Sequence, residues 1–84
     1  MGDSLNIVYI LKSDKHLDRY YTGLTSDMAR RLEFHNTGQS RHTASGCPWR
    51  VVATIHFADP FRAEQFEIYL KSGSGRSFAT RHFR

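Results

Sequence analysis

Two tyrosines and three charged or titratable side chains give this sequence a set of groups suited to phosphodiester hydrolysis. Tyr9 and Tyr21 lie in two β-type segments, and Arg31 and His35 follow one helical turn apart. A tyrosine hydroxyl can orient or deprotonate water, and an arginine can neutralise charge that grows on phosphoryl oxygens. Glu67, much later in the chain, supplies a carboxylate able to hold a divalent cation.

Glu67 stands out because helical spacing places it among residues expected to pack inward. It lies four residues after Ala63 and three before Leu70. A buried, ionised carboxylate is costly unless it is paired or holds a metal. Lys71, four residues later, offers an ion pair in the favourable orientation. The sequence leaves the two alternatives, ion pair and metal ligand, open.

The segment with Arg31 and His35 also has a simpler interpretation. Asp27, Arg31 and His35 are spaced four apart and share one helix face, expected to point away from the core residues Met28 and Leu32. An exposed ion pair between Asp27 and Arg31 would contribute only a few tenths of a kcal/mol, about 0.3–0.5.

Hydrophobic patterning and turn residues predict the elements that position these groups. Strands are expected at 5–11, 19–23 and 50–57, and helices at 26–36, at 60–71 and over a short final segment through 78–83. Ser26 is the expected N-cap of the first helix, Gly38 ends it, and Asp59 with Pro60 begins the second helix. The "SGSG" stretch at 72–75 is expected to break the chain.

The predicted fold class is α/β (α+β), with one domain over residues 1–84. A three-stranded antiparallel sheet is flanked by helices in the order β-β-α-β-α-α. With 84 residues, the chain buries only a thin core. A long loop at 37–49 separates the first helix from the third strand, and Trp49 is expected to anchor it to the core.

Charge favours an anionic partner. The net charge is +4, and every acidic residue lies at or before Glu67, so the C-terminal segment is purely basic. The single cysteine, Cys47, excludes an intramolecular disulfide and fits a reducing compartment. No signal peptide or apolar span is apparent, so a cytoplasmic protein without membrane association is expected.

An ordered set of four landmarks resembles the GIY-YIG nuclease family. "VYI" at 8–10 and "YTG" at 21–23 are similar to the paired triplets of that family. Arg31 falls eight residues after the glycine of the second triplet, and His35 lies one turn later. "EIYLK" at 67–71 resembles the Glu-x-x-Leu/Ile-Lys segment of the family's later helix. The similarity covers residues 6–76 and extends to small stand-alone members.

The resemblance implies a metal-dependent endonuclease that hydrolyses DNA by attack of water. Tyr21 would act as general base or position the water, and Tyr9 would support it or bind phosphate. Arg31 would stabilise the transition state, and His35 would contact phosphate or assist proton transfer. Glu67 would bind one Mg²⁺ or Mn²⁺. Ile7 stands where many members have glycine, which is compatible if the backbone needs no positive φ.

Other cations are expected to contact the nucleic acid, for which DNA is the expected form. They are Arg30, Arg41, His42, Lys71 and Arg76. The alternative function is a nucleic-acid-binding module of the same fold with weak or no turnover. Neither oligomeric state nor substrate structure follows from the sequence.

Overall fold

A computed structural model describes residues 4–84 and confirms the predicted order of elements. The elements are β1 (Ile7–Ser13), β2 (Tyr20–Thr25), α1 (Met28–Asn36), a 3-10 turn (Ala44–Gly46), β3 (Trp49–His56), α2 (Pro60–Leu70) and α3 (Gly73–His82). The strands form one antiparallel sheet in the order β2-β1-β3. No helix within residues 4–84 is long and apolar enough to cross a membrane.

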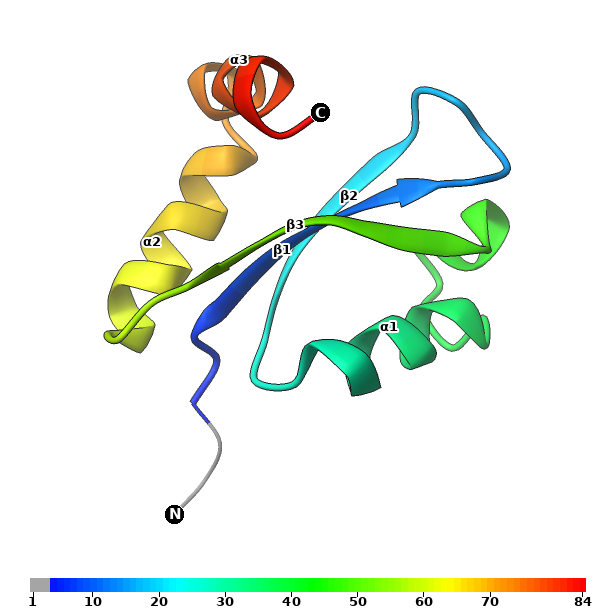
Figure 1. Cartoon of the computed structure of the whole chain (residues 1–84), viewed down its shortest axis with the longest axis horizontal. Helices are drawn as coiled ribbons and strands as arrows, with labels where there is room; N and C mark the ends of the chain where they lie inside the picture. Colours follow the sequence, from blue (N-terminus) through cyan, green and yellow to red (C-terminus); the bar gives the residue numbers. More distant parts are fainter. Residues whose placement is uncertain (1–3) are drawn as a thin grey trace.

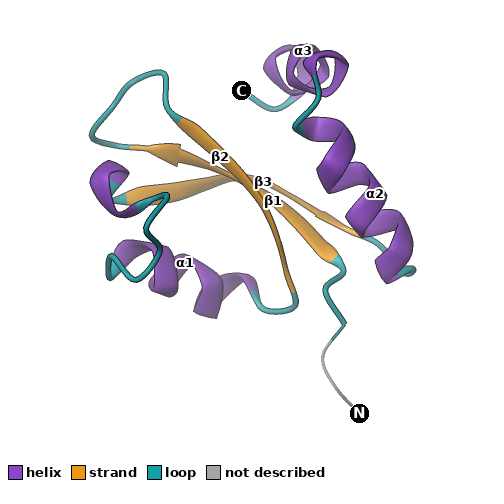
Figure 2. Ribbon diagram, turned by 180° about the vertical axis from the view of Figure 1, so that it is seen from behind, coloured by secondary structure: helices purple, strands orange, loops and turns teal. Residues whose placement is uncertain are grey.

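The central strand β1 is apolar along most of its length because helices cover both of its faces. Figures 1 and 2 show α1 against one face of the sheet and α2 with α3 against the other. Successive side chains of a strand point to opposite faces. Val8 and Ile10 therefore pack with α2 and α3, whereas Tyr9 and Leu11 pack on the side of α1.

Two core clusters result, one on each face of the sheet. The first joins the β1 residues to the two C-terminal helices, through Val8, Ile10, Ala63, Leu70 and Ala79. The second joins β1, β2, α1 and β3, through Tyr9, Leu11, Trp49, Tyr21, Met28 and Leu32. Both tyrosines of the predicted site thus belong to the packing of the second cluster.

The strand boundaries differ from those predicted by one or two residues. The first strand begins at Ile7 and continues through Ser13, beyond the apolar run. Ser13 fits this buried position because its hydroxyl donates to the carbonyl of Gly46 and accepts from the amides of Lys15 and His16. A satisfied polar side chain can therefore extend a strand past its hydrophobic residues.

The prediction that Ser26 caps α1 is wrong by one residue. Asp27 is the N-cap, and its Oδ1 accepts from the amide of Arg30 at 3.1 Å. Thr25 holds the backbone of Asp27 through its hydroxyl. No ion pair joins Asp27 to Arg31 among the described residues, so the simpler interpretation of this helix fails. Gly38, with φ of 75°, follows the helix end as predicted.

The "SGSG" stretch was expected to break the chain over residues 72–75. Of these residues, only Ser72 lies between the two helices, and the other three form the start of α3. Ser72 is the N-cap of α3 and accepts from the amide of Gly75 at 3.2 Å. A Cβ at Gly75 would overlap the carbonyl of Tyr69 at the end of α2. The glycine therefore lets α3 pack directly against α2, which fixes the position of the neighbouring Arg76.

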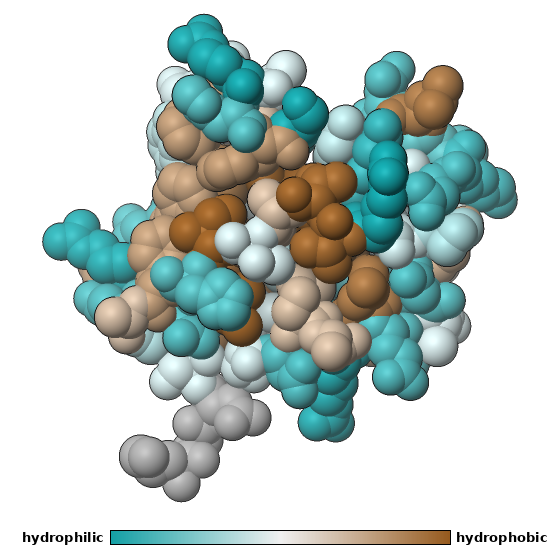
Figure 3. Space-filling view, viewed as in Figure 1, coloured by the Kyte–Doolittle hydropathy of each residue, from teal (hydrophilic) through white to brown (hydrophobic). Residues whose placement is uncertain are grey.

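The thin core leaves part of the apolar surface visible. Figure 3 shows hydrophobic side chains across the middle of one face, with hydrophilic side chains around them. The larger exposed apolar side chains are Leu5, Leu17, Phe61, Ile68 and Tyr69. Such incomplete burial is expected of a chain of this length.

The two glycines of α3 provide a matched test of this packing. Gly75→Ala should lower the free energy of unfolding by about 1–3 kcal/mol, because the new methyl group meets backbone. Gly73→Ala, where a Cβ meets nothing within 4 Å, should instead stabilise the protein by up to about 1 kcal/mol. Urea denaturation followed by circular dichroism measures both. Equal effects of the two substitutions would contradict the proposed close approach.

Candidate active site

The sheet register brings the two predicted site tyrosines together. Tyr9 pairs with Gly23 across β1 and β2, and Tyr21 pairs with Leu11. The two tyrosines are therefore diagonal neighbours on the face covered by α1, with ring centroids 6.2 Å apart. Tyr20 points to the opposite face, where it packs against the first core cluster.

The glycine of the second triplet makes room for the ring of Tyr9. A Cβ at Gly23 would overlap the hydroxyl end of that ring. The hydroxyl of Tyr9 can therefore lie over the backbone of β2 only if position 23 has no side chain. This steric role was not foreseen from the sequence, in which the glycine served only as a motif position.

The hydroxyl of Tyr9 is the centre of a buried hydrogen-bond network. It is hydrogen-bonded to Nε2 of His35 at 2.8 Å and accepts from Nε of Arg31 at 3.3 Å. The other ring nitrogen of His35 is hydrogen-bonded to the hydroxyl of Thr43 at 2.7 Å. Tyr9, His35 and Thr43 are each 0% exposed.

This network corrects the expected orientation of α1. Arg31 and His35 were expected to face away from Met28 and Leu32, yet both point toward the sheet and contact Tyr9. The inward residues Met28, Leu32 and His35 are spaced by four and three positions, with Arg31 beside Leu32. That is the usual spacing of a buried helix stripe.

The pKa values of the buried pair favour neutral side chains. Burial raises the pKa of Tyr9 above its ordinary value; the hydrogen bond from Arg31 opposes this effect, and the negative charges of Tyr21 and Glu67 add to it. Burial, assisted by the positive charge of Arg31, lowers the pKa of His35. A neutral imidazole has one donor and one acceptor nitrogen, which is the pair that Thr43 and Tyr9 satisfy.

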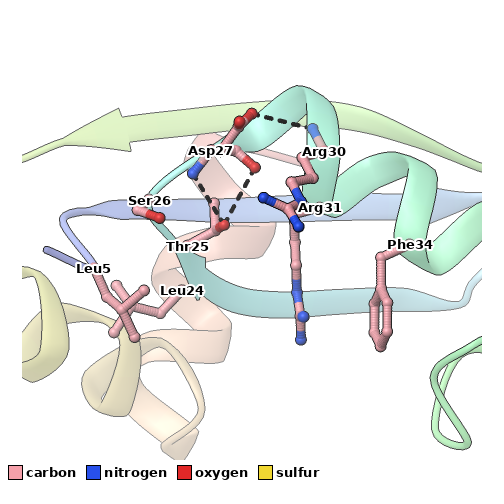
Figure 4. A pocket seen from close by; sticks show the side chains of 8 residues that line it. All are labelled: Leu5, Leu24, Thr25, Ser26, Asp27, Arg30, Arg31 and Phe34. Carbon is pink, nitrogen blue, oxygen red and sulfur yellow. Dashed lines mark hydrogen bonds between the residues drawn. The ribbon is translucent and has the colours of Figure 1, made fainter. Parts of the chain in front are cut away.

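Arg31 extends from this network toward the surface. Its guanidinium lies over the ring of Phe34, 4.4 Å from the centroid. Figure 4 shows Arg31 and Phe34 on one side of a hollow of about 500 Å³, with Leu5 and Leu24 on the other. Arg30 also lines this hollow, so two cationic side chains meet at its rim.

Tyr21 differs from Tyr9 in being half-buried, with a hydroxyl that forms no hydrogen bond within residues 4–84. Its ring lies 5.0 Å from that of His35, between centroids. Tyr21 also borders a second hollow, of about 230 Å³, together with Lys71 and Arg76. Of the two site tyrosines, Tyr21 is therefore the one that can meet a substrate.

Glu67 lies on α2 and forms the predicted ion pair. Its Oε2 is 2.6 Å from Nζ of Lys71, and its side chain is 15% exposed. Because α2 packs on the face opposite α1, Glu67 is separated from the Tyr9 network by the sheet, and its negative charge is the smallest of the causes that raise the pKa of Tyr9. Glu67 lines neither the hollow beside Arg31 nor the one beside Tyr21.

The donor set fits a hard divalent cation that keeps most of its water. No three His, Cys, Asp or Glu side chains between residues 4 and 84 are grouped as a metal cage. Mg²⁺ commonly binds through one or two carboxylates together with substrate phosphates. Glu67 has a second oxygen outside its ion pair, so it can serve as that single protein ligand.

Comparison with known proteins identifies the family of this chain. The family model described as GIY-YIG catalytic domain matches residues 5–80. The chain belongs to the GIY-YIG family. It is thereby placed in a nuclease family, and the resemblance noted in the sequence is confirmed. No solved structure matches the chain.

Relatives with the name UPF0213 protein occur in several bacteria. One from Cupriavidus necator is 36% identical over 71 residues, which cover 83% of this chain and 75% of the relative. One from Halalkalibacterium halodurans is 36% identical over 70 residues, covering 82% and 72%. One from Streptococcus pneumoniae is 38% identical over 53 residues, covering 62% and 54%. These relatives support a small stand-alone GIY-YIG protein.

The structure accommodates isoleucine at position 7, where many members of the GIY-YIG family have glycine. Ile7 is buried in β1, and no residue other than glycine has a positive φ within residues 4–84. An isoleucine therefore fits where other members have glycine. Leu24, next to the second triplet, packs against the first core cluster and lines the hollow beside Arg31.

The remaining predicted substrate contacts are not gathered at one point. Arg30 lines the hollow beside Arg31, whereas Lys71 and Arg76 line the one beside Tyr21. Arg41 and His42 are exposed in the loop after α1, where the carbonyl of His42 accepts from Arg19. The next residue along this loop, Thr43, contacts His35. Nothing in the sequence distinguishes this hydroxyl from the loop's other polar residues.

The neutral state of His35 predicts a dependence of stability on pH. Because folding lowers the pKa of His35 from 6.5, the unfolded chain binds a proton that the native protein does not. This contribution is fully present above pH 6.5 and is lost as the pH falls through the native pKa. The free energy of unfolding should therefore fall as the pH drops from 6.5 toward the native pKa of His35, by at most ~1.4 kcal/mol per pH unit.

His35→Gln should remove this component, so its stability should change less over the same pH range. Urea denaturation at each pH gives the two curves, and an NMR titration of the His35 ring should give a pKa below 6.5. Parallel stability curves together with an unshifted ring titration would contradict the assignment.

Proposed function

We propose that this GIY-YIG protein is a metal-dependent endonuclease that hydrolyses DNA phosphodiester bonds by attack of water. The observation that carries the proposal is the hydrogen-bonded chain from Arg31 through Tyr9 and His35 to Thr43. This chain holds a cationic side chain against Tyr9, and the rings of Tyr9 and His35 in turn neighbour the ring of Tyr21. Hydrogen bonds within the protein therefore hold Arg31 in place before any substrate binds, as the chemistry expected from the family requires.

In the proposed reaction, the Tyr21 hydroxyl orients the attacking water, either as general base or as a hydrogen-bonding partner. The water oxygen forms a bond to phosphorus, and the bond from phosphorus to the leaving oxygen breaks. Where Tyr21 is the general base, its oxygen accepts a proton from the water and its own hydroxyl proton passes to solvent; where Tyr21 only orients the water, the proton of the water passes to solvent directly. The leaving oxygen takes up a proton from solvent. The Arg31 guanidinium stabilises the negative charge that develops on the phosphoryl oxygens.

Tyr9 and His35 act in this proposal as positioning residues. Each is 0% exposed, so neither offers surface to a phosphate. Tyr9 fixes Arg31 by accepting from its Nε, and His35 fixes Tyr9 in turn. Holding Arg31 in one place before substrate arrives avoids reorganisation in the transition state.

Glu67 is the proposed ligand of one Mg²⁺ or Mn²⁺. When bound, such an ion supplies positive charge to the leaving oxygen. Lys71 holds the carboxylate in place through the ion pair and is itself half-exposed, so it can also reach substrate phosphate. We assign further substrate contacts to Arg30, Arg41, His42 and Arg76, consistent with the net charge of +4.

The metal requirement has a matched control on the same helix. Glu67→Gln should reduce nicking of supercoiled DNA by about 100-fold or more, because a metal ion contributes several kcal/mol to the transition state. Glu64→Gln, one turn earlier and exposed, should cleave at the wild-type rate. EDTA should abolish cleavage by the wild-type protein, and added Mn²⁺ should restore it. Equal rates for the two variants would remove Glu67 from the mechanism.

The proposed role of Tyr21 can be isolated by removing its hydroxyl alone. Tyr21→Phe should lower the rate constant of cleavage by about 100-fold or more, the usual contribution of a general base. Tyr69→Phe, an exposed tyrosine on α2, serves as the control. Single-turnover cleavage at saturating protein separates this effect from binding. Wild-type cleavage by Tyr21→Phe would show that another group orients the water.

One observation favours a second function, a nucleic-acid-binding module without turnover. The ion pair with Lys71 already neutralises Glu67, so the carboxylate is stable without any metal. This alternative requires salt-dependent DNA binding and no cleavage with either Mg²⁺ or Mn²⁺. The nicking assay above therefore decides between the two functions.

A further inference from the structure

A group of cations lines the hollow of about 230 Å³ that Tyr21 borders, on the side away from Arg31 and His35. Its lining includes Lys71 at the end of α2, Arg76 in the first turn of α3, and Arg84 after α3. Tyr20 and Tyr21 of β2 form the opposite wall of this hollow of about 230 Å³. Residues remote in sequence thus place three positive side chains around one space.

Most of this charge is not neutralised by the protein. Within residues 4–84, Arg76 and Arg84 form no ion pair, and only Lys71 is paired. No acidic residue follows Glu67, so α3 carries positive charge without compensation. Like charges held this close repel one another, which an anion in the hollow would relieve.

Tyr20 orients this group and favours an anion over a stacked base. The guanidinium of Arg84 lies 4.5 Å from the centroid of its ring, and Nζ of Lys12 lies 5.8 Å from the same centroid. A ring that already holds cations has less face available for a nucleobase. The contact instead fixes Arg84 at the edge of the hollow.

The positive surface continues along α3 beyond this hollow. Arg76 also lines a third hollow, together with Ser77, Thr80 and Arg81. Cations and hydroxyl groups at successive turns are suited to repeated phosphates, because backbone phosphates recur at regular intervals. A single nucleotide would occupy only part of this surface.

We propose that Lys71, Arg76 and Arg84 form a subsite for a phosphate of the substrate strand next to the bond that is cut. The strand then continues over α3 toward Arg81. The substrate is accordingly a polynucleotide that extends past the scissile phosphate on the α3 side, not a mononucleotide or a short diester. This inference rests on the proposed function for the identity of the ligand.

The test measures binding of a fluorescein-labelled DNA duplex in EDTA, by anisotropy between about 50 and 200 mM salt. The variant Arg76→Gln/Arg84→Gln should lower the slope of log affinity against log salt by about 0.9, the value for one lost phosphate contact on duplex DNA. The control, Lys15→Gln/Arg62→Gln, removes the same charge from exposed residues that line none of the hollows described above. Its slope should remain close to that of the wild type.

One further variant and one further measurement keep the outcome clear. Arg76→Lys/Arg84→Lys retains the charge and should retain the wild-type slope, and thermal denaturation shows whether each variant is folded. Equal slopes for the test and control pairs would overturn the subsite. If the wild type then still cuts DNA, the nuclease proposal stands. If the test pair alone loses binding in a protein that never cuts, the subsite stands and the nuclease proposal fails.

Discussion

The hydroxyl of Tyr9 is the constraint on which the rest of this structure depends. It lies within a fully buried side chain, so it must find its partners inside the protein. His35 and Arg31 provide them, and both come from α1. These two contacts fix the rotation of a nine-residue helix against the sheet. Leaving such a group without partners would cost about 1–3 kcal/mol.

The need to satisfy the buried hydroxyl of Tyr9 also constrains residues on the neighbouring strand and in the loop after α1. Gly23 must lack a side chain so that the ring of Tyr9 can cross β2. Thr43 must satisfy the second nitrogen of His35, which places the loop after α1 against the core. Trp49 then holds that loop by donating from Nε1 to the carbonyl of Thr43 at 2.8 Å. Loop position and site geometry are therefore consequences of one buried polar network.

Sequence patterns predicted the strand part of the site better than the helix part. The period of two in a strand is sufficient to point Tyr20 and Tyr21 to opposite faces, and the hairpin register then brings Tyr21 beside Tyr9. On α1, however, His35 was treated as a polar surface residue, although it completes the inward spacing begun by Met28 and Leu32. Hydrophobicity alone cannot identify a buried histidine, because its burial depends on partners elsewhere in the chain.

Thr43 and Arg84 show the other limit of prediction from sequence. Each acquires its role through a contact with a distant residue, His35 for Thr43 and Tyr20 for Arg84. No local spacing encodes such contacts, since they depend on sheet register and on how α3 packs. The glutamate on α2 was different, because its inward position and its partner Lys71 both lie within one helix.

In a chain this short, the same side chains belong to the core and to the candidate site. The second core cluster includes both tyrosines, and His35 fills space that an apolar side chain would occupy in a purely structural domain. A buried neutral network stabilises less than close apolar packing and specifies geometry more strictly. Arg31 and Glu67 both lie outside the fully buried set, and no Asp, Glu, Lys or Arg side chain within residues 4–84 belongs to that set. The buried interior is therefore neutral, and the charged groups of the domain lie where water or a ligand can compensate them.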